Sequence, residues 1–162
     1  MRRLATLLIA LLLSAVLGAP PTAAAADETL ATGGAGGIYP PGATLDGVTI
    51  NGLQAGFGVA INPDGSAPGQ FCAVLIGISP LGSEQYITIE GEATNGSRSA
   101  PNMAVLSGTA SVDMGDGVPP TPGIPFIVTV TTDANGQGTI GLVLGLTTLP
   151  SAVVNSGSMT IE

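Results

Sequence analysis

Three loop segments place carboxylate and amide oxygens close together, and such oxygens are what calcium requires. Asp133 and Asn135 have the D-x-N-G spacing with which many calcium loops begin, and Asp113 and Asp116 share a glycine-rich segment. The third segment runs from Asn62 to Ser66. Calcium binds oxygen ligands and needs neither His nor Cys. Asp113, Asp116, Asp133 and Asn135 are therefore candidate metal ligands, and calcium is the one cofactor that the sequence suggests.

The same residues have a second interpretation as ordinary turn residues. Asn, Asp and Gly are favoured in tight turns because they hydrogen-bond their own backbone or tolerate a positive φ. None of the three segments has the acidic residue that completes an EF-hand loop. A calcium site would therefore need carboxylates from separate loops to converge in the fold.

Glu90 and Glu92 are the other candidates for chemistry, since paired carboxylates can hydrolyse glycosidic bonds. Their i, i+2 spacing places both on the outward face of one strand. Hydrolysis would need a second acid across a cleft, and sugar sites are usually lined with aromatic side chains, which are only 3% of this chain. A solvated strand face that blocks aggregation is the competing interpretation.

The composition excludes most other enzyme mechanisms. The chain contains no His and no Lys, and its basic residues are Arg2, Arg3 and Arg98. Without His there is no proton relay for a Ser or Cys nucleophile, and without Lys there is no Schiff base. Zinc held by His or by several Cys is excluded as well. We therefore expect that the protein is not an enzyme.

Cys72 is the only thiol, so no disulfide can form within the chain. The segment from Phe71 to Ile76 is apolar at every position, which predicts that Cys72 is buried as a small hydrophobic residue. The alternative is a reactive thiolate, which normally needs a cation nearby, and only Arg98 could supply one.

The first 26 residues have the layout of a secretory signal peptide. Arg2 and Arg3 form a short basic region, Leu4 to Ala19 is an uncharged apolar run, and Ala24 to Ala26 fits the small-residue rule for cleavage. An uncleaved N-terminal anchor is the alternative. We expect a mature chain that starts near Asp27 and is secreted, either extracellular or periplasmic.

Charge limits the partners of this expected mature chain. All 11 acidic residues follow residue 26, and Arg98 is the only basic residue in the same part of the chain. Nucleic acids and anionic membranes need clusters of Lys and Arg, so both are disfavoured by Coulomb repulsion. The remaining partners are an extracellular protein, a glycan or a surface.

Apolar stretches alternate with turn residues along the rest of the chain. Residues 27–47 are rich in Gly, Ala and Pro with little periodicity, which predicts a flexible arm. Residues 48–162 are expected to form a single β-domain. Its predicted strands are Leu53–Ile61, Phe71–Ile78, Gln85–Thr94, Met103–Asp113, Pro125–Asp133, Thr139–Leu146 and Ser158–Ile161.

Short connections between these strands favour antiparallel neighbours. The predicted fold is all-β, an antiparallel β-sandwich or closed barrel of about seven strands, preceded by the cleaved signal peptide. The last segment, Ser158 to Glu162, is a candidate unpaired edge strand that could pair with another chain.

The run from Gly56 to Ser66, followed by Gly69-Gln70-Phe71, resembles a pattern found in bacterial secreted and cell-surface β-domains. Such domains continue with a strand similar to Gly108–Val112 and often close with one similar to Gly157–Ile161. The resemblance covers most of residues 48–162. It implies an extracellular β-module, commonly of unknown function, and no catalytic residues.

Three classes of function remain. The first, which the missing catalytic residue types favour, is a secreted non-catalytic module for extracellular binding or a structural role in an envelope. The second is a calcium-dependent binding protein that uses the Asp-rich loops. The third is a carboxylate-based glycoside hydrolase, which would need Glu90 or Glu92 in a concave acidic pocket.

Overall fold

The structure is a computed structural model and describes residues 27–162, so the predicted signal peptide lies outside the described residues. The described part is all-β and contains no helix. Its strands are β1 (Thr29–Ile38), β2 (Thr44–Leu45), β3 (Val48–Ile61), β4 (Ser66–Ile78), β5 (Glu84–Ala100), β6 (Met103–Asp113), β7 (Thr121–Thr132), β8 (Gly138–Leu144), β9 (Thr147–Thr148) and β10 (Ala152–Ile161).

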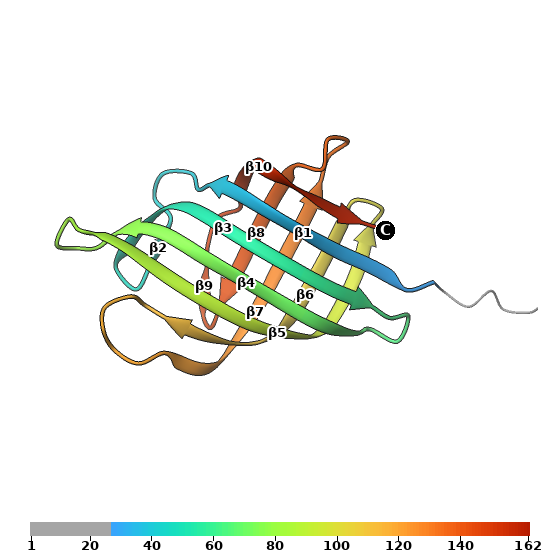
Figure 1. Cartoon of the computed structure of the whole chain (residues 1–162), viewed down its shortest axis with the longest axis horizontal. Helices are drawn as coiled ribbons and strands as arrows, with labels where there is room; N and C mark the ends of the chain where they lie inside the picture. Colours follow the sequence, from blue (N-terminus) through green and yellow to red (C-terminus); the bar gives the residue numbers. More distant parts are fainter. Residues whose placement is uncertain (1–26) are drawn as a thin grey trace, which may run out of the picture.

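Every strand pairing is antiparallel, as the short connections predicted. From β3 to β8 the long strands pair in sequence order, β8 pairs with β10, and β10 pairs with β1. Since β1 also pairs with β3, the series of pairings returns to its start. In Figure 1, β1, β3 and β4 cross in front of β6, β7 and β8.

The prediction that residues 27–47 form a flexible arm is wrong for residues 29–38, which form β1. This strand pairs with β3 from Thr29↔Ile61 to Ile38↔Gly52 and with β10 on its other side. Three of its four glycines have a packing reason; a Cβ on Gly33, for example, would lie 2.8 Å from the carbonyl oxygen of Ser158. Close approach of β1 and β10 therefore explains a composition that resembles a flexible segment.

Other strand ends also differ from the predictions. The strand predicted to end at Thr94 continues in β5 as far as Ala100, and the polar side chains of this extension face solvent. Leu146, the last residue of the predicted strand Thr139–Leu146, lies in the β8–β9 turn and is fully exposed. Met103–Asp113 has the predicted bounds.

Alternation of side chains produces one buried apolar core. Leu53, Phe57 and Val59 of β3 face inward, and so do Ile87 and Ile89 of β5, as the period-2 pattern predicted. The core is almost entirely apolar, since Thr29 and Tyr39, whose ring is apolar but carries a hydroxyl, are the only buried residues with a polar side-chain group in the described part of the chain. Its largest buried side chains are Phe71 and Phe126.

The segment Ser158–Glu162 is not an unpaired edge. Gly34↔Ser158 and Ala31↔Ile161 are strand partners, and Leu30 and Glu162 exchange backbone hydrogen bonds of 2.8 and 3.0 Å. The opposite side of β10 is less well paired. Its ladder with β8 has only the pairs Ala152↔Ile140 and Val153↔Thr139, followed by the bond from Met159 N–H to Gly136 O at 2.7 Å.

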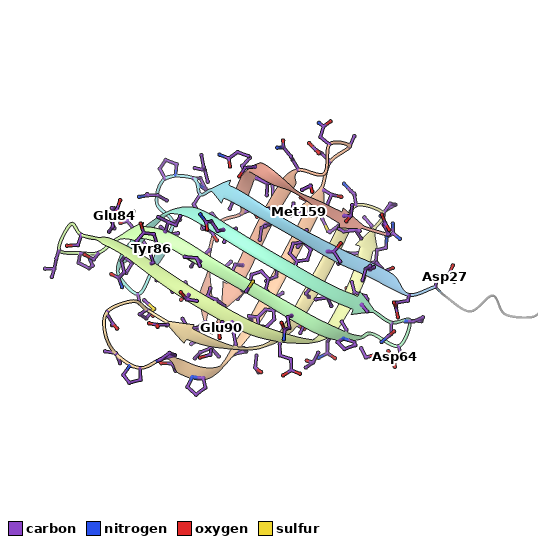
Figure 2. All side chains as sticks on the ribbon, viewed as in Figure 1. Asp27, Asp64, Glu84, Tyr86, Glu90 and Met159 are labelled. Atoms are coloured by element: carbon purple, nitrogen blue, oxygen red, sulfur yellow. The ribbon has the colours of Figure 1, made fainter. Side chains whose placement is uncertain are left out.

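The structure has two ends, set by the directions of the strands. The β2–β3, β4–β5, β6–β7 and β8–β9 turns lie at one end, here called the pocket end, and the β3–β4, β5–β6 and β7–β8 turns lie at the far end. Figure 2 shows Glu84 and Tyr86 toward the pocket end and Asp27 and Asp64 at the far end. No helix capable of crossing a membrane occurs among residues 27–162.

Candidate functional site

An apolar pocket lies between the β2–β3 turn, the end of β6, the start of β7 and the β8–β9 turn. Its volume is about 390 Å³. We call it the mouth pocket, and its lining residues are Leu45, Asp46, Val112, Met114, Thr121, Ile124, Leu144, Gly145, Leu146 and Thr147. Val112 and Leu144 are core residues, so the floor of the pocket is the end of the packed interior.

Two tight turns form the rim of the mouth pocket. Asp46 and Gly47 connect β2 to β3 with φ angles of 47° and 84°, which are those of a type I′ turn. Asp-Gly is favoured in such turns because both central residues need a positive φ. Across the pocket, Gly145 and Leu146 connect β8 to β9, and Gly145 N–H donates to Pro125 O at 2.8 Å. The rim is therefore held by backbone geometry.

The polar groups of the mouth pocket are few. Asp46 contributes an exposed carboxylate, and Thr121 and Thr147 contribute hydroxyl groups. The other side chains in the lining are aliphatic or, for Met114, a thioether. An apolar concavity with a small number of polar groups is the usual form of a small-molecule site.

The charges around the pocket end are all negative within the described part of the chain. Asp46, Glu84, Asp113 and Asp116 lie on the turns of this end or beside them. Arg98, the only base among residues 27–162, lies near the far end of β5, where its guanidinium donates to Pro101 O at 2.8 Å. The pocket end therefore has a negative potential that no nearby cation offsets.

The sequence alone did not identify the mouth pocket, because its residues come from four separate segments. Asp46 fell within the predicted flexible arm, although Asp46-Gly47 between two apolar stretches is a hairpin signal. Met114 and Thr121 fell in or beside a predicted loop. Only the closing of the strand pairings brings β2, β6, β7 and β8 to one place.

The structure does not bring the four candidate calcium ligands together. Asp113 and Asp116 are at the pocket end, after β6, whereas Asp133 and Asn135 are at the far end, in the turn between β7 and β8. The length of β7 separates the two pairs. Among residues 27–162, no group of three or more His, Cys, Asp or Glu residues is arranged to hold a metal ion.

The Asp carboxylates instead stabilise their own turns. Asp133 Oδ1 accepts from Asn135 N–H at 2.8 Å and from Gln137 N–H at 2.9 Å. Asp113 Oδ1 accepts from Gly115 N–H at 2.8 Å, and Asp116 Oδ1 accepts from Val118 N–H at 2.9 Å. These are Asx turns, the second of the two interpretations of the loop residues.

Asp64, from the third loop, follows the same pattern. Its Oδ1 accepts from the Ser66 hydroxyl at 2.6 Å and from Ser66 N–H at 2.9 Å. The hydrogen bond from the Ser66 side chain, followed by that from its backbone, lowers the pKa of Asp64 because both stabilise the ionised carboxylate.

Glu90 and Glu92 point outward from β5, as the alternation predicted. With Gln70 and Cys72 they line an open depression of about 690 Å³ on the outer face of β4 and β5. Glu90 also lines a smaller one, of about 140 Å³, with Asp113 on the neighbouring strand. Its other lining residues are Thr88, Ser111 and Pro120, so this depression offers no aromatic ring to a sugar. The geometry supports a solvated strand face.

The prediction that Cys72 is buried is wrong. Its neighbours Phe71 and Ala73 face the core, so Cys72 points outward and its thiol is exposed. The Sγ atom lies 3.4 Å from the carbonyl oxygen of Gly56 on the adjacent strand. The sequence does not reveal which residues of this segment face outward, because those residues are apolar as well.

A comparison of this chain with protein families, with curated proteins and with solved structures found no match in any of the three. The resemblance to bacterial secreted and cell-surface β-domains therefore stays a prediction.

Proposed function

We propose that this protein is a secreted, non-catalytic β-module that binds a small apolar ligand in the mouth pocket. The observation that carries the proposal is the position of the pocket, an open apolar concavity at the end of an otherwise packed interior. Its volume of about 390 Å³ lies within the range of roughly 300–1,000 Å³ that is typical of ligand sites.

The shape that best fits the pairings is a closed barrel, which forms the proposed scaffold for this site. Returning pairings remove the free edges of a sheet, and the mouths of such barrels are common ligand sites. The side chains of Phe71 and Phe126 occupy the interior, which favours the end of the barrel as the ligand site. Secretion is supported by the layout of the first 26 residues.

Binding of a neutral fluorescent probe tests the proposal. N-phenyl-1-naphthylamine becomes emissive in apolar sites, and the chain has no Trp to complicate the signal. We expect saturable binding with a stoichiometry of one. Ile124→Trp should fill the mouth pocket and abolish binding, whereas Ile127→Trp, on the outer face of the same strand, should leave it unchanged.

Both variants carry one Trp, so they match in composition and in fluorescence background. Circular dichroism and thermal unfolding verify that each is folded, and Met114→Trp replaces Ile124→Trp if that variant is not. Probe binding that is equal in the folded pocket-filling variant and in the control would contradict the proposal, and so would the absence of saturable binding to the unmodified chain.

A further inference from the structure

We propose that the ligand of the mouth pocket is an amphipathic cation, with its apolar body in the pocket and its positive group at the Asp46 carboxylate. This inference rests on the proposed function and names the chemical class of the ligand. Its first support is the lining itself, in which Asp46 is the one charged residue among mostly apolar neighbours such as Leu45, Leu144 and Leu146.

The position of Asp46 is fixed by its turn. Its φ of 47° is accessible at low cost to few residues other than Gly, Asn and Asp. Below the turn, Ile50 N–H donates to Ala43 O at 2.9 Å, and Leu45 pairs with Val48. The hairpin thus fixes the backbone of Asp46 at the rim, and a bound cation would need to order only its side chain.

The surrounding charges disfavour the opposite ligand class. An anionic head group at the rim would meet Asp46 and the field of Glu84, Asp113 and Asp116, and no described base is near enough to neutralise it. A cation gains from the same field. The hydroxyls of Thr121 and Thr147 can accept hydrogen bonds from an ammonium group, which has donors only.

A neutral apolar molecule is the remaining alternative. The effect of ligand charge on the affinity distinguishes it from a cation. Asp46 is exposed, so the attraction has the magnitude of a surface ion pair, about two- to fivefold in affinity. The effect should weaken with salt, because the Debye length falls to about 3 Å at 1 M.

Three compounds that share one ring system provide the test: 1-naphthylmethylammonium, 1-naphthylmethanol and 1-naphthoate. Their dissociation constants are measured by displacement of N-phenyl-1-naphthylamine at low and at high salt. We expect the cation to bind about two- to fivefold more tightly than the alcohol at low salt, and the anion to bind most weakly. The preference should disappear at 1 M salt.

The substitution Asp46→Asn tests the charge of Asp46 alone, because Asn is equally suited to the type I′ turn. It should remove the preference for the cation and leave binding of the alcohol unchanged. Glu84→Gln and Asp116→Asn alter the net charge by the same amount at the same end and do not line the pocket, so they should retain most of the preference.

The possible results distinguish a failure of the cation proposal from a failure of both proposals. If the probe and the alcohol bind but the cation has no advantage, or if Asp46→Asn keeps that advantage, the cation proposal is wrong and the apolar site stands. If none of the compounds displaces the probe because no probe binds, both proposals fail.

Discussion

The rings of Phe71 and Phe126 stack across the interior, with their centroids 5.5 Å apart and an interplanar angle of 26°. The two residues come from β4 and β7, which are separated in the sheet by β5 and β6. Between them on β5 lies Gly91, where a Cβ atom would be 2.7 Å from Cε1 of Phe126. The absence of a side chain at position 91 therefore leaves the space that the Phe126 ring occupies.

Gly91→Ala should lower the free energy of unfolding by about 1–3 kcal/mol, because the new methyl group overpacks the core against an aromatic ring. Chemical denaturation measures the change. The control is Gly58→Ala on the outer face of β3, where a Cβ meets no atom within 4 Å and the effect should stay within about 0.5 kcal/mol. In a Phe126→Leu background, Gly91→Ala should lower the free energy of unfolding by less than it does in the unmodified protein. An equal decrease in both backgrounds would rule out a clash with Phe126.

Tyr39→Phe should raise the free energy of unfolding by about 1 kcal/mol at neutral pH. The Tyr39 side chain is 4% exposed, and its hydroxyl is the one buried side-chain polar atom among residues 27–162 without a hydrogen-bond partner. Removing an unsatisfied polar atom removes its desolvation cost. Tyr86→Phe is the control, since Tyr86 is exposed, and an equal effect of the two substitutions would contradict the explanation.

The same tyrosine predicts a loss of stability in alkali. Burial raises the pKa of Tyr39 from 10.0 to about 12. Because the folded pKa lies above the unfolded one, its contribution is fully present below pH 10 and is lost as the pH rises through about 12, by about 2–3 kcal/mol. Denaturation from pH 9 to 12 should show this decline, and Tyr39→Phe should reduce it. A profile that is identical in the two proteins would be inconsistent with a buried phenol.

Cys72 should react as an accessible thiol. We expect Ellman's reagent to modify one equivalent in the native protein, because the side chain points outward from β4. Cys72→Ser should alter the free energy of unfolding by no more than about 0.5 kcal/mol, as for an exposed position. A thiol that reacts only after denaturation would show that this strand face is covered in solution.

Calcium should leave the thermal midpoint unchanged relative to EDTA, since the loop carboxylates lie at opposite ends and accept backbone hydrogen bonds. A bound ion would instead stabilise the native state by about 2.7 kcal/mol at a hundredfold excess over its dissociation constant. Asp133→Ala should cost about 1–2 kcal/mol through the lost bonds to Asn135 and Gln137. Asp133→Asn keeps an acceptor oxygen and should cost less. A clear shift with calcium would restore the metal hypothesis.

The class of the fold and most of its strands were predictable from the sequence, because period-2 alternation reports directly which side of a strand is buried. The predicted strands Leu53–Ile61, which lies within β3, and Met103–Asp113, which is β6, are confirmed examples. It failed where both sides of a strand are apolar, as around Cys72, and where glycine serves close packing, as at Gly33 in β1.

The mouth pocket was not predictable for a different reason. Asp46, Met114 and Leu146 belong to separate connections at one end of the strands, and the pairing of β1 with both β3 and β10 is what brings these connections together. Local patterns contain no information on that long-range closure. The Asx turns were foreseeable, since the preference of Asp for turns depends on its own neighbouring backbone, as at Asp133.

The mutual hydrogen bonds of Leu30 and Glu162 fix the orientation in which the molecule can be displayed. They place both described ends of the chain side by side, away from Asp46 and Leu146, as Figure 1 shows for the C-terminus and the start of β1. A tether, tag or fusion partner joined at either end therefore leaves the pocket facing outward. A short linker between the two ends would also suffice for a circular permutant opened at the β5–β6 turn, far from the rim.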